Sequence, residues 1–188
     1  MAAISPSSVA SVVPNAAGVE RGNRDCQKSL AQLLSISIAW YYTDEERAKV
    51  LNELLAKVKS RDGAKKDEVL GAMWAMSYGI SRCNQRNTVL PQELVAAVMD
   101  ELYNSVQSSI VTVQLTACQS IGIVGRFKPL PVDSVKKSQI IARIIAILNS
   151  SEGHQIETAA ESLGNIALGD RNKETVKQIL DALLNLFK

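Results

Sequence analysis

The sequence holds few of the residues from which most active sites are built. It has one histidine, His154, and three cysteines that lie far apart, Cys26, Cys83 and Cys118. One histidine cannot supply a two-histidine metal site, and no cysteine pair has the spacing of a zinc ligand set. Cys83 and Cys118 fall in apolar helical segments, where a buried structural thiol is expected rather than a nucleophile paired with His154. We therefore expect no enzyme: no catalytic residue, no metal and no cofactor.

A strong charge imbalance and long apolar runs are also missing. The net charge is +2 and basic residues are mixed with acidic ones, whereas nucleic-acid binding usually needs a concentrated basic face. No apolar run approaches the roughly 18 residues that span a bilayer. The first 20 residues contain no Lys or Arg and are interrupted by Pro6 and Pro14, which argues against a secretory signal. With cysteines that cannot all pair, this predicts a cytoplasmic or nuclear protein with reduced thiols, whose partners are proteins rather than nucleic acid, membranes or small substrates.

The sequence does contain helix patterns separated by short polar breaks. Residues 1–22 are rich in Ala, Ser, Val, Pro and Gly and predict a flexible leader. After them, Thr43 and Glu46 form a capping-box signature, Pro91 suits a first helical turn, and Asp170 is a plausible N-cap. Strand signals are weak, so the fold class is all-α. The breaks divide the chain into four approximate helical pairs: residues 23–60, 65–106, 109–149 and 152–188.

A short motif recurs at a fixed interval along these pairs. It reads small, variable, Ser, apolar, Gly in three segments, Ala75–Gly79, Cys118–Gly122 and Ala160–Gly164, with a weaker copy, Leu33–Ser37. The last residues of the four copies are separated by 42, 43 and 42 positions. HEAT and armadillo repeats have periods of about 40–47 residues, unlike tetratricopeptide or ankyrin repeats. Two helices per repeat favour HEAT, so the sequence predicts an α-solenoid of about four HEAT-type hairpins.

The recurring glycines, Gly79, Gly122 and Gly164, have two possible structural roles. A glycine inside a helix costs about 1 kcal/mol relative to alanine. Its return in one register suggests that two helix backbones approach closely there. The alternative is that each glycine ends its helix as a C-cap, and this alternative leaves the repeat assignment unchanged.

A few basic residues are candidates for partner binding. Arg82 and Arg126 follow the repeat glycine by three and four residues. They form either a row of guanidinium groups for an acidic partner or favourable cations at helix C-termini. Lys136 and Lys137, like the pair at residues 65–66, are either partner-binding or solvated loop charge.

Two apolar segments also admit alternatives. Residues 127–131, Phe-Lys-Pro-Leu-Pro, predict an extended connection between two helices. This connection either exposes an apolar contact strip or packs back over its own repeat. The cluster of Met73, Trp74, Met76 and Tyr78 has helical spacing and is expected in the core rather than around a ligand.

Three of these segments resemble successive repeats of the proteasome adapter and scaffold family. They are residues 70–79 (LGAMWAMSYG), residues 117–131 with the distinctive GRFKPLP ending, and residues 162–170 (SLGNIALGD). The similarity covers roughly residues 67–188, and the sequence departs from it at Trp74, at Tyr78 and in the leader. Members of that family are very long HEAT-repeat proteins that hold the core and regulatory particles of the proteasome together.

The resemblance implies a non-catalytic protein-binding scaffold. Two other functions remain open: a HEAT adaptor for nuclear transport or a phosphatase-type scaffold, and an unrecognised cysteine enzyme. The last helix pattern reaches Lys188 without a stop signal, and neither end carries a polar capping repeat. We therefore expect a segment of a longer chain with an exposed apolar end.

Overall fold

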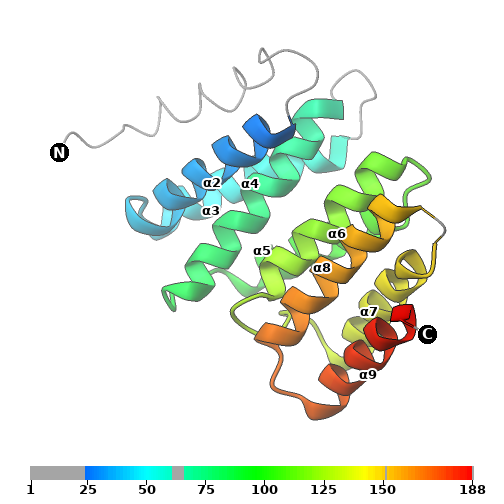
Figure 1. Ribbon diagram of the computed structural model, residues 1–188. Coiled ribbons are helices and arrows are strands. Elements are labelled where there is room, and N and C mark those ends of the chain that lie inside the picture. Colours follow the sequence, from blue (N-terminus) through cyan, green and yellow to red (C-terminus); the bar gives the residue numbers. More distant parts are fainter. Residues whose placement is uncertain (1–23, 61–65, 151, 188) are drawn as a thin grey trace. The chain divides into compact units, whose positions relative to one another are not determined.

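The computed structural model describes residues 24–60, 66–150 and 152–187 (Figure 1). The expected leader, residues 1–22, lies outside this part of the chain. The described residues form eight α-helices and one short 3-10 helix, with no strand among them. The all-α prediction is confirmed. The helices are α2 (Arg24–Trp40), α3 (Asp44–Ser60), α4 (Lys66–Gln85), α5 (Gln92–Val106), α6 (Val111–Gly125), α7 (Ser134–Leu148), α8 (Gly153–Gly169) and α9 (Lys173–Leu184), followed by η3 (Asn185–Phe187).

The helices begin where local signals predict, with one exception. The amide of Thr43 donates to Glu46 Oε2 at 2.9 Å, and the amide of Glu46 donates to Thr43 Oγ1 at 3.2 Å, so the capping box before α3 is confirmed. Pro91 directly precedes α5. The predicted N-cap at Asp170 is wrong. Asn172 caps α9, because its side chain accepts hydrogen bonds from two backbone amides of the first turn, while Asp170 follows the last residue of α8.

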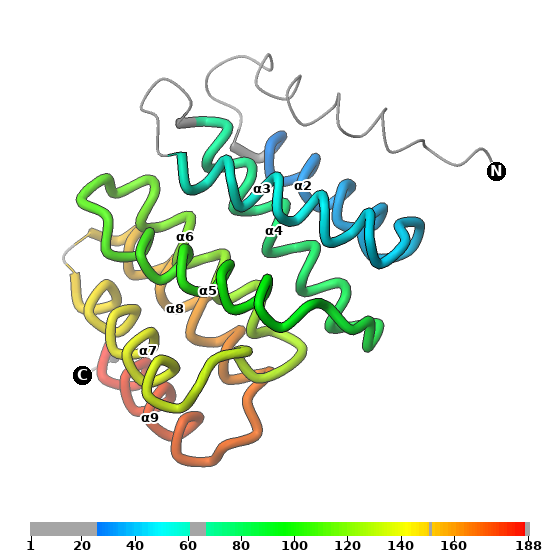
Figure 2. Tube along the Cα trace, turned by 180° about the vertical axis from the view of Figure 1, so that it is seen from behind, coloured from blue at the N-terminus to red at the C-terminus, as the bar shows by residue number. Residues whose placement is uncertain are grey.

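The chain divides into two compact units. The first unit ends at Val98 and the second begins at Met99, so that α5 crosses the boundary. In the first unit α4 packs against both α2 and α3. In the second unit α8 packs against both α6 and α7, and α9 packs against α7 and α8. Figure 2 shows α7 and α9 side by side. In each unit, therefore, the first helices of two successive hairpins lie against each other.

The cluster around Trp74 is part of the core of the first unit. Met73, Trp74 and Met76 are buried on α4, which confirms the core interpretation for these three. Tyr78 is only partly buried, and its hydroxyl accepts a hydrogen bond from Gln32 Nε2 at 3.1 Å. The largest side chains that are fully buried are aliphatic or methionine: Ile38, Leu51, Met73, Met76, Ile80, Met99, Leu102, Ile121, Ile140, Ile141, Ile144 and Leu148.

The three recurring glycines differ in what surrounds them. A Cβ atom on Gly122 would lie 2.7 Å from the Cα of Ser162, so α6 and α8 approach closely there. A Cβ atom on Gly79 would lie 3.1 Å from the side chain of Ile38. Among the described residues, Gly164 has no such neighbour within 4 Å, and the close-packing prediction is wrong for it. All three lie inside their helices, so the C-cap alternative is wrong as well.

Candidate partner-binding surface

Arg82 and Arg126 each lie at the C-terminal end of the first helix of a hairpin. Arg82 lies in the last turn of α4 and its Nη1 donates to Gln85 Oε1 at 3.1 Å. Arg126 is the residue directly after α6, and its guanidinium lies 5.7 Å from the centre of the Phe127 ring. These positions favour the interpretation as cations that interact with helix C-termini. Arg82 belongs to the first unit and Arg126 to the second.

Lys136 and Lys137 are not solvated loop charges. Both lie in the first turn of α7. Lys136 forms an ion pair with Asp100 of α5, and its Nζ lies 5.6 Å from the centre of the Tyr103 ring. Lys137 Nζ lies 2.8 Å from Asp170 Oδ2. Each lysine therefore ties α7 to a neighbouring element, and their predicted loop placement is wrong because α7 already begins at Ser134.

Asp170 is the most enclosed carboxylate of this arrangement. Its side chain is 3% exposed and that of Lys137 is 18% exposed. Burial alone would raise the pKa of the Asp170 carboxyl. The hydrogen bond from Lys137 and those from the backbone outweigh burial and hold the pKa below its usual value. Asp170 is therefore ionised at neutral pH, and its carboxylate is occupied by Lys137 rather than available to a partner.

The connection between α6 and α7 buries one residue and exposes several of its neighbours. Leu130 is buried, and a Cβ atom on Gly125 would lie 3.1 Å from Leu130 Cδ2. Phe127 is 45% exposed, and Pro129 and Pro131 are exposed too. Both predicted alternatives therefore hold in part: Leu130 anchors the connection to its own unit, and the residues around it form an apolar strip.

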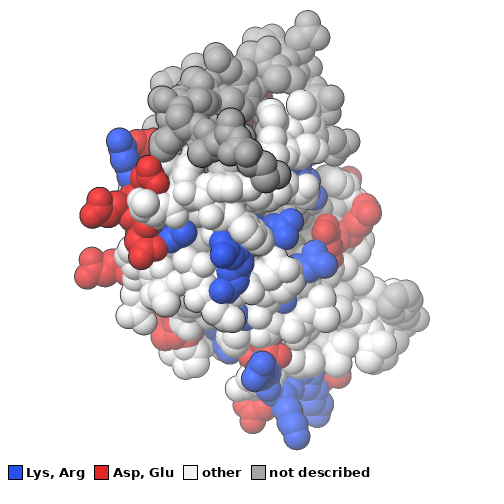
Figure 3. Space-filling model, turned by 90° about the vertical axis from the view of Figure 1, so that its left-hand side faces the viewer, with Lys and Arg blue, Asp and Glu red and all other residues white. Residues whose placement is uncertain are grey.

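This connection lies against the turn between α8 and α9. A Cβ atom on Gly169 would lie 1.8 Å from the carbonyl oxygen of Gly125 and 2.8 Å from that of Lys128. The two segments thus touch through their backbones. Figure 3 shows Lys and Arg side chains beside Asp and Glu side chains at the foot of the view, over the turn between α8 and α9 that is also lowest in Figure 1. We define the loop surface as Arg126, Phe127, Lys128, Pro129, Pro131 and Arg171.

Two arginines of the first unit, Arg86 and Arg47, have structural roles that were not predicted from the sequence. The guanidinium of Arg86 stacks 4.7 Å from the centre of the Trp40 ring and donates to the carbonyl of Ala39. Arg47 is buried and donates to the carbonyls of Ile38 at 2.9 Å and Tyr42 at 2.8 Å. One signal could have indicated Arg47: it stands on the apolar side of α3, four residues before Leu51.

The cysteines and the histidine lack the setting of a reactive site. Burial raises the pKa of the Cys83 thiol, and it raises that of Cys118 to about 11 although Ser162 Oγ lies 3.4 Å from the sulfur. Both thiols are therefore protonated at neutral pH, which opposes nucleophilic attack. His154 is exposed in the first turn of α8. In the part of the chain that the structure describes, no three His, Cys, Asp or Glu side chains could share a metal ion.

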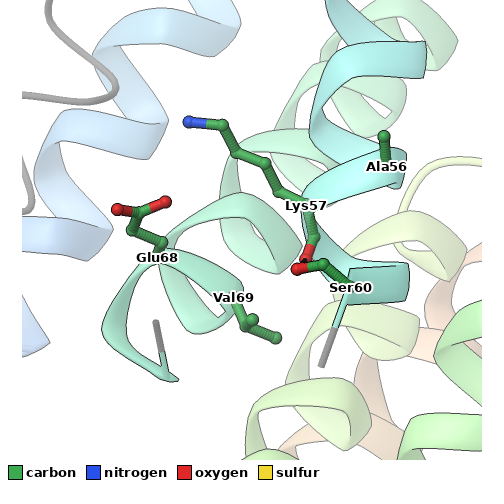
Figure 4. A pocket seen from close by; sticks show the side chains of 5 residues that line it. All are labelled: Ala56, Lys57, Ser60, Glu68 and Val69. Carbon is green, nitrogen blue, oxygen red and sulfur yellow. Dashed lines mark hydrogen bonds between the residues drawn. The ribbon is translucent and has the colours of Figure 1, made fainter. Parts of the chain in front are cut away.

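A hollow of about 270 Å³ opens where α3 ends and α4 begins (Figure 4). Ala56, Lys57, Ser60, Glu68 and Val69 line it. Lys57 and Glu68 are its charged side chains, and they extend from facing helices. One cation and one anion beside open solvent do not form a catalytic group, and we assign no ligand to this hollow.

Comparison with known proteins gives a fold and no function. No protein-family model and no curated protein matches the sequence. Among solved structures, the chain is similar to the crystal structure of an engineered protein from the Northeast Structural Genomics Consortium. The TM-score is 0.51 at 19% sequence identity, over 93% of this chain and 67% of that chain. A likeness at this identity concerns the fold alone. In addition, no helix among the described residues has the length and apolar character to cross a membrane.

Proposed function

We propose that this chain is a non-catalytic protein-binding scaffold made of HEAT-type hairpins, and that its partners are proteasome particles. The observation that carries the scaffold proposal is the packing order within each unit. α2 lies against α4, and α6 lies against α8. The first helix of one hairpin thus covers the first helix of the next, which is how repeats bury apolar faces that a single hairpin leaves open.

The α7–α9 contact supports the same interpretation. In the second unit the second helices of two successive hairpins also pack together, while α8 packs against α7. The segments that connect the paired helices carry the charged and exposed apolar side chains of the loop surface. A scaffold of this kind acts by presenting surface to other proteins. The proteasome itself enters the proposal through the sequence resemblance of residues 67–188.

The test is direct binding of the whole chain to purified proteasome particles. The immobilised chain is exposed in turn to the core particle, the regulatory particle, a nuclear transport receptor and a phosphatase catalytic subunit, and binding is followed by biolayer interferometry. We expect saturable binding to a proteasome particle only. Binding to the transport receptor or the phosphatase instead would replace the proteasome proposal with the other adaptor function.

Thiol labelling tests the rival cysteine enzyme. Native chain is reacted with a maleimide and the labelled positions are read by mass spectrometry over time. We expect Cys26, which is partly exposed, to react first, with Cys83 and Cys118 labelled only after unfolding. Fast labelling of either buried cysteine in the folded chain would contradict the non-catalytic proposal. A Cys83→Ser and Cys118→Ser chain that is folded and still binds its partner would support it.

A further inference from the structure

We propose that the loop surface binds an acidic peptide segment of a partner protein, one in which a large apolar side chain stands among Asp and Glu residues. This inference deepens the proposed scaffold function by naming the chemistry of the partner. It depends on the juxtaposition of two connections in the second unit, α6 to α7 and α8 to α9. Together they carry two exposed arginines, Arg126 and Arg171, the half-buried Lys128, and the exposed apolar residues Phe127, Pro129 and Pro131.

The cations of the loop surface differ from their neighbours in having no acidic partner. Among the described residues, Lys136 and Lys137 are paired with Asp100 and Asp170. Arg126, Lys128 and Arg171 form no ion pair with any carboxylate in the part of the chain that the structure describes. The carboxylate closest in sequence to Arg171, that of Asp170, is already occupied by Lys137. Three cations thus remain for the carboxylates of a partner, and arginine binds a carboxylate through two parallel hydrogen bonds.

The apolar part of the loop surface is exposed and held in place. Phe127 lies between Arg126 and Lys128 in the sequence, and its ring is in contact with the Arg126 guanidinium. Leu130 of the same connection is buried, and the amide of Val132 donates to the carbonyl of Leu130 at 2.8 Å. Proline at positions 129 and 131 restricts the backbone further. A segment that is ordered before binding loses little conformational entropy when a partner arrives.

A peptide fits this surface better than a nucleic acid does. Nucleic-acid binding depends on many phosphate contacts spread over a basic face. The loop surface offers only three cations, together with an aromatic ring and two prolines. Asp133 and Glu174 stand nearby in the sequence and would repel a uniform polyanion. A peptide can instead place its carboxylates opposite the cations and its apolar side chain against Phe127.

The test measures binding of a defined probe to the full chain by fluorescence anisotropy. The probe is a fluorescein-labelled peptide of about twelve residues, which reaches about 40 Å when extended. It consists of Glu and Asp with a central Phe-Leu pair. Three comparison probes are used: the peptide with every Glu and Asp replaced by Lys, the peptide with the central pair replaced by Ser, and a single-stranded RNA of equal negative charge. We expect the acidic apolar peptide to bind most tightly.

Two variants locate the binding site. Arg126→Glu combined with Lys128→Glu removes two of the three cations, and Phe127→Ser removes the ring. Each should weaken binding roughly tenfold or more, because each removes a central part of a small contact surface. The matched control is Lys49→Glu combined with Lys59→Glu, which makes the same change in net charge at exposed positions of α3. Circular dichroism verifies that every variant is folded, and amide NMR shifts of the wild type should cluster at residues 126–131 and 170–173.

Four results would overturn the proposal. They are no binding of the acidic apolar peptide, an equal loss of peptide affinity in the control variant, tighter binding of the RNA than of the peptide, and NMR shifts confined to other residues. Its failure can be separated from failure of the scaffold function. If the charge-reversed chain binds proteasome particles as the wild type does, the scaffold function stands and the loop surface is not its contact. If the peptide binds as expected and no proteasome particle does, the loop surface stands and the proteasome proposal falls.

Discussion

The two units join their hairpins through different kinds of contact. In the first unit, Gly79 of α4 faces the side chain of Ile38, whose end can move aside. In the second unit, Gly122 of α6 faces the backbone of Ser162, and Gly169 of α8 faces the carbonyl of Gly125. In the same glycine register, the backbone therefore faces a side chain in one unit and another backbone in the other.

The units also differ in how they use buried charge. In the first unit, Arg47 donates to two carbonyls at the end of α2 and pairs with Asp44, which is exposed. In the second unit, Lys137 pairs with Asp170 and both side chains are largely enclosed. The first arrangement satisfies the C-terminus of one helix, whereas the second links a helix start to the turn of the following hairpin. Stability should therefore depend on different residue types in the two units.

Gly169→Ala should have the largest effect. Its Cβ atom would meet the carbonyl oxygen of Gly125 at 1.8 Å, and neither backbone can move without separating α6 from α8. We expect a loss of about 3 kcal/mol or more in the free energy of unfolding, the upper range for overpacking. Urea unfolding, followed by circular dichroism, measures this loss of stability. Gly79→Ala is the control, because it meets only the movable Ile38 side chain. Equal effects would show that the two units do not differ in this way.

Arg47→Met should have the next largest effect. The change leaves the carbonyls of Ile38 and Tyr42 without their buried donor, at a cost of about 2–3 kcal/mol in unfolding free energy. Met keeps the length and apolar stem of the side chain. Arg86→Met provides the comparison, because Arg86 is exposed and contacts a single carbonyl, that of Ala39. A smaller loss for Arg47→Met than for Arg86→Met would contradict the role of burial in the first unit.

Asp170→Asn should produce a smaller and pH-dependent loss. The folded chain holds the pKa of Asp170 below its usual value, so the ion pair contributes stability fully above the unfolded pKa of about 3.9. That contribution disappears as the pH falls through the folded pKa. We expect the variant to be about 2 kcal/mol less stable at pH 7. Unfolding curves should converge with those of the wild type as the pH falls below the unfolded pKa of about 3.9 and through the lower folded pKa. A difference that is constant across pH would mean that the charge of Asp170 does not matter.

Local signals allowed the helices to be predicted, and distant contacts account for what was missed. The capping box at Thr43 acts over three residues, and helical periodicity over a few turns, so both are visible in the sequence. The sequence does not show that Asp170 and Lys137 are paired, because the two residues lie 33 positions apart. Without that contact, Asp170 resembles an N-cap and Lys137 a solvated charge.

The glycines show the same limit. A period of 42 or 43 residues placed Gly79, Gly122 and Gly164 in one register. It did not show which of them has a neighbouring backbone, because that depends on the helix packed against each one. The contact of Gly169 with Gly125 was not predicted at all, since it lies outside the repeated motif.

Gly164→Ala should have the smallest effect, and the opposite sign. Nothing lies within 4 Å of the position where its Cβ atom would stand, and the residue is inside α8. Alanine there gains helix propensity without a clash, so the chain should become more stable by up to about 1 kcal/mol. Gly122→Ala, in the same register of the preceding hairpin, should be destabilising because Ser162 lies in the way. Opposite signs from two glycines of one motif would show that the neighbouring helix, and not the motif, decides how a glycine affects stability. A loss of stability in Gly164→Ala would mean that this face of α8 is covered.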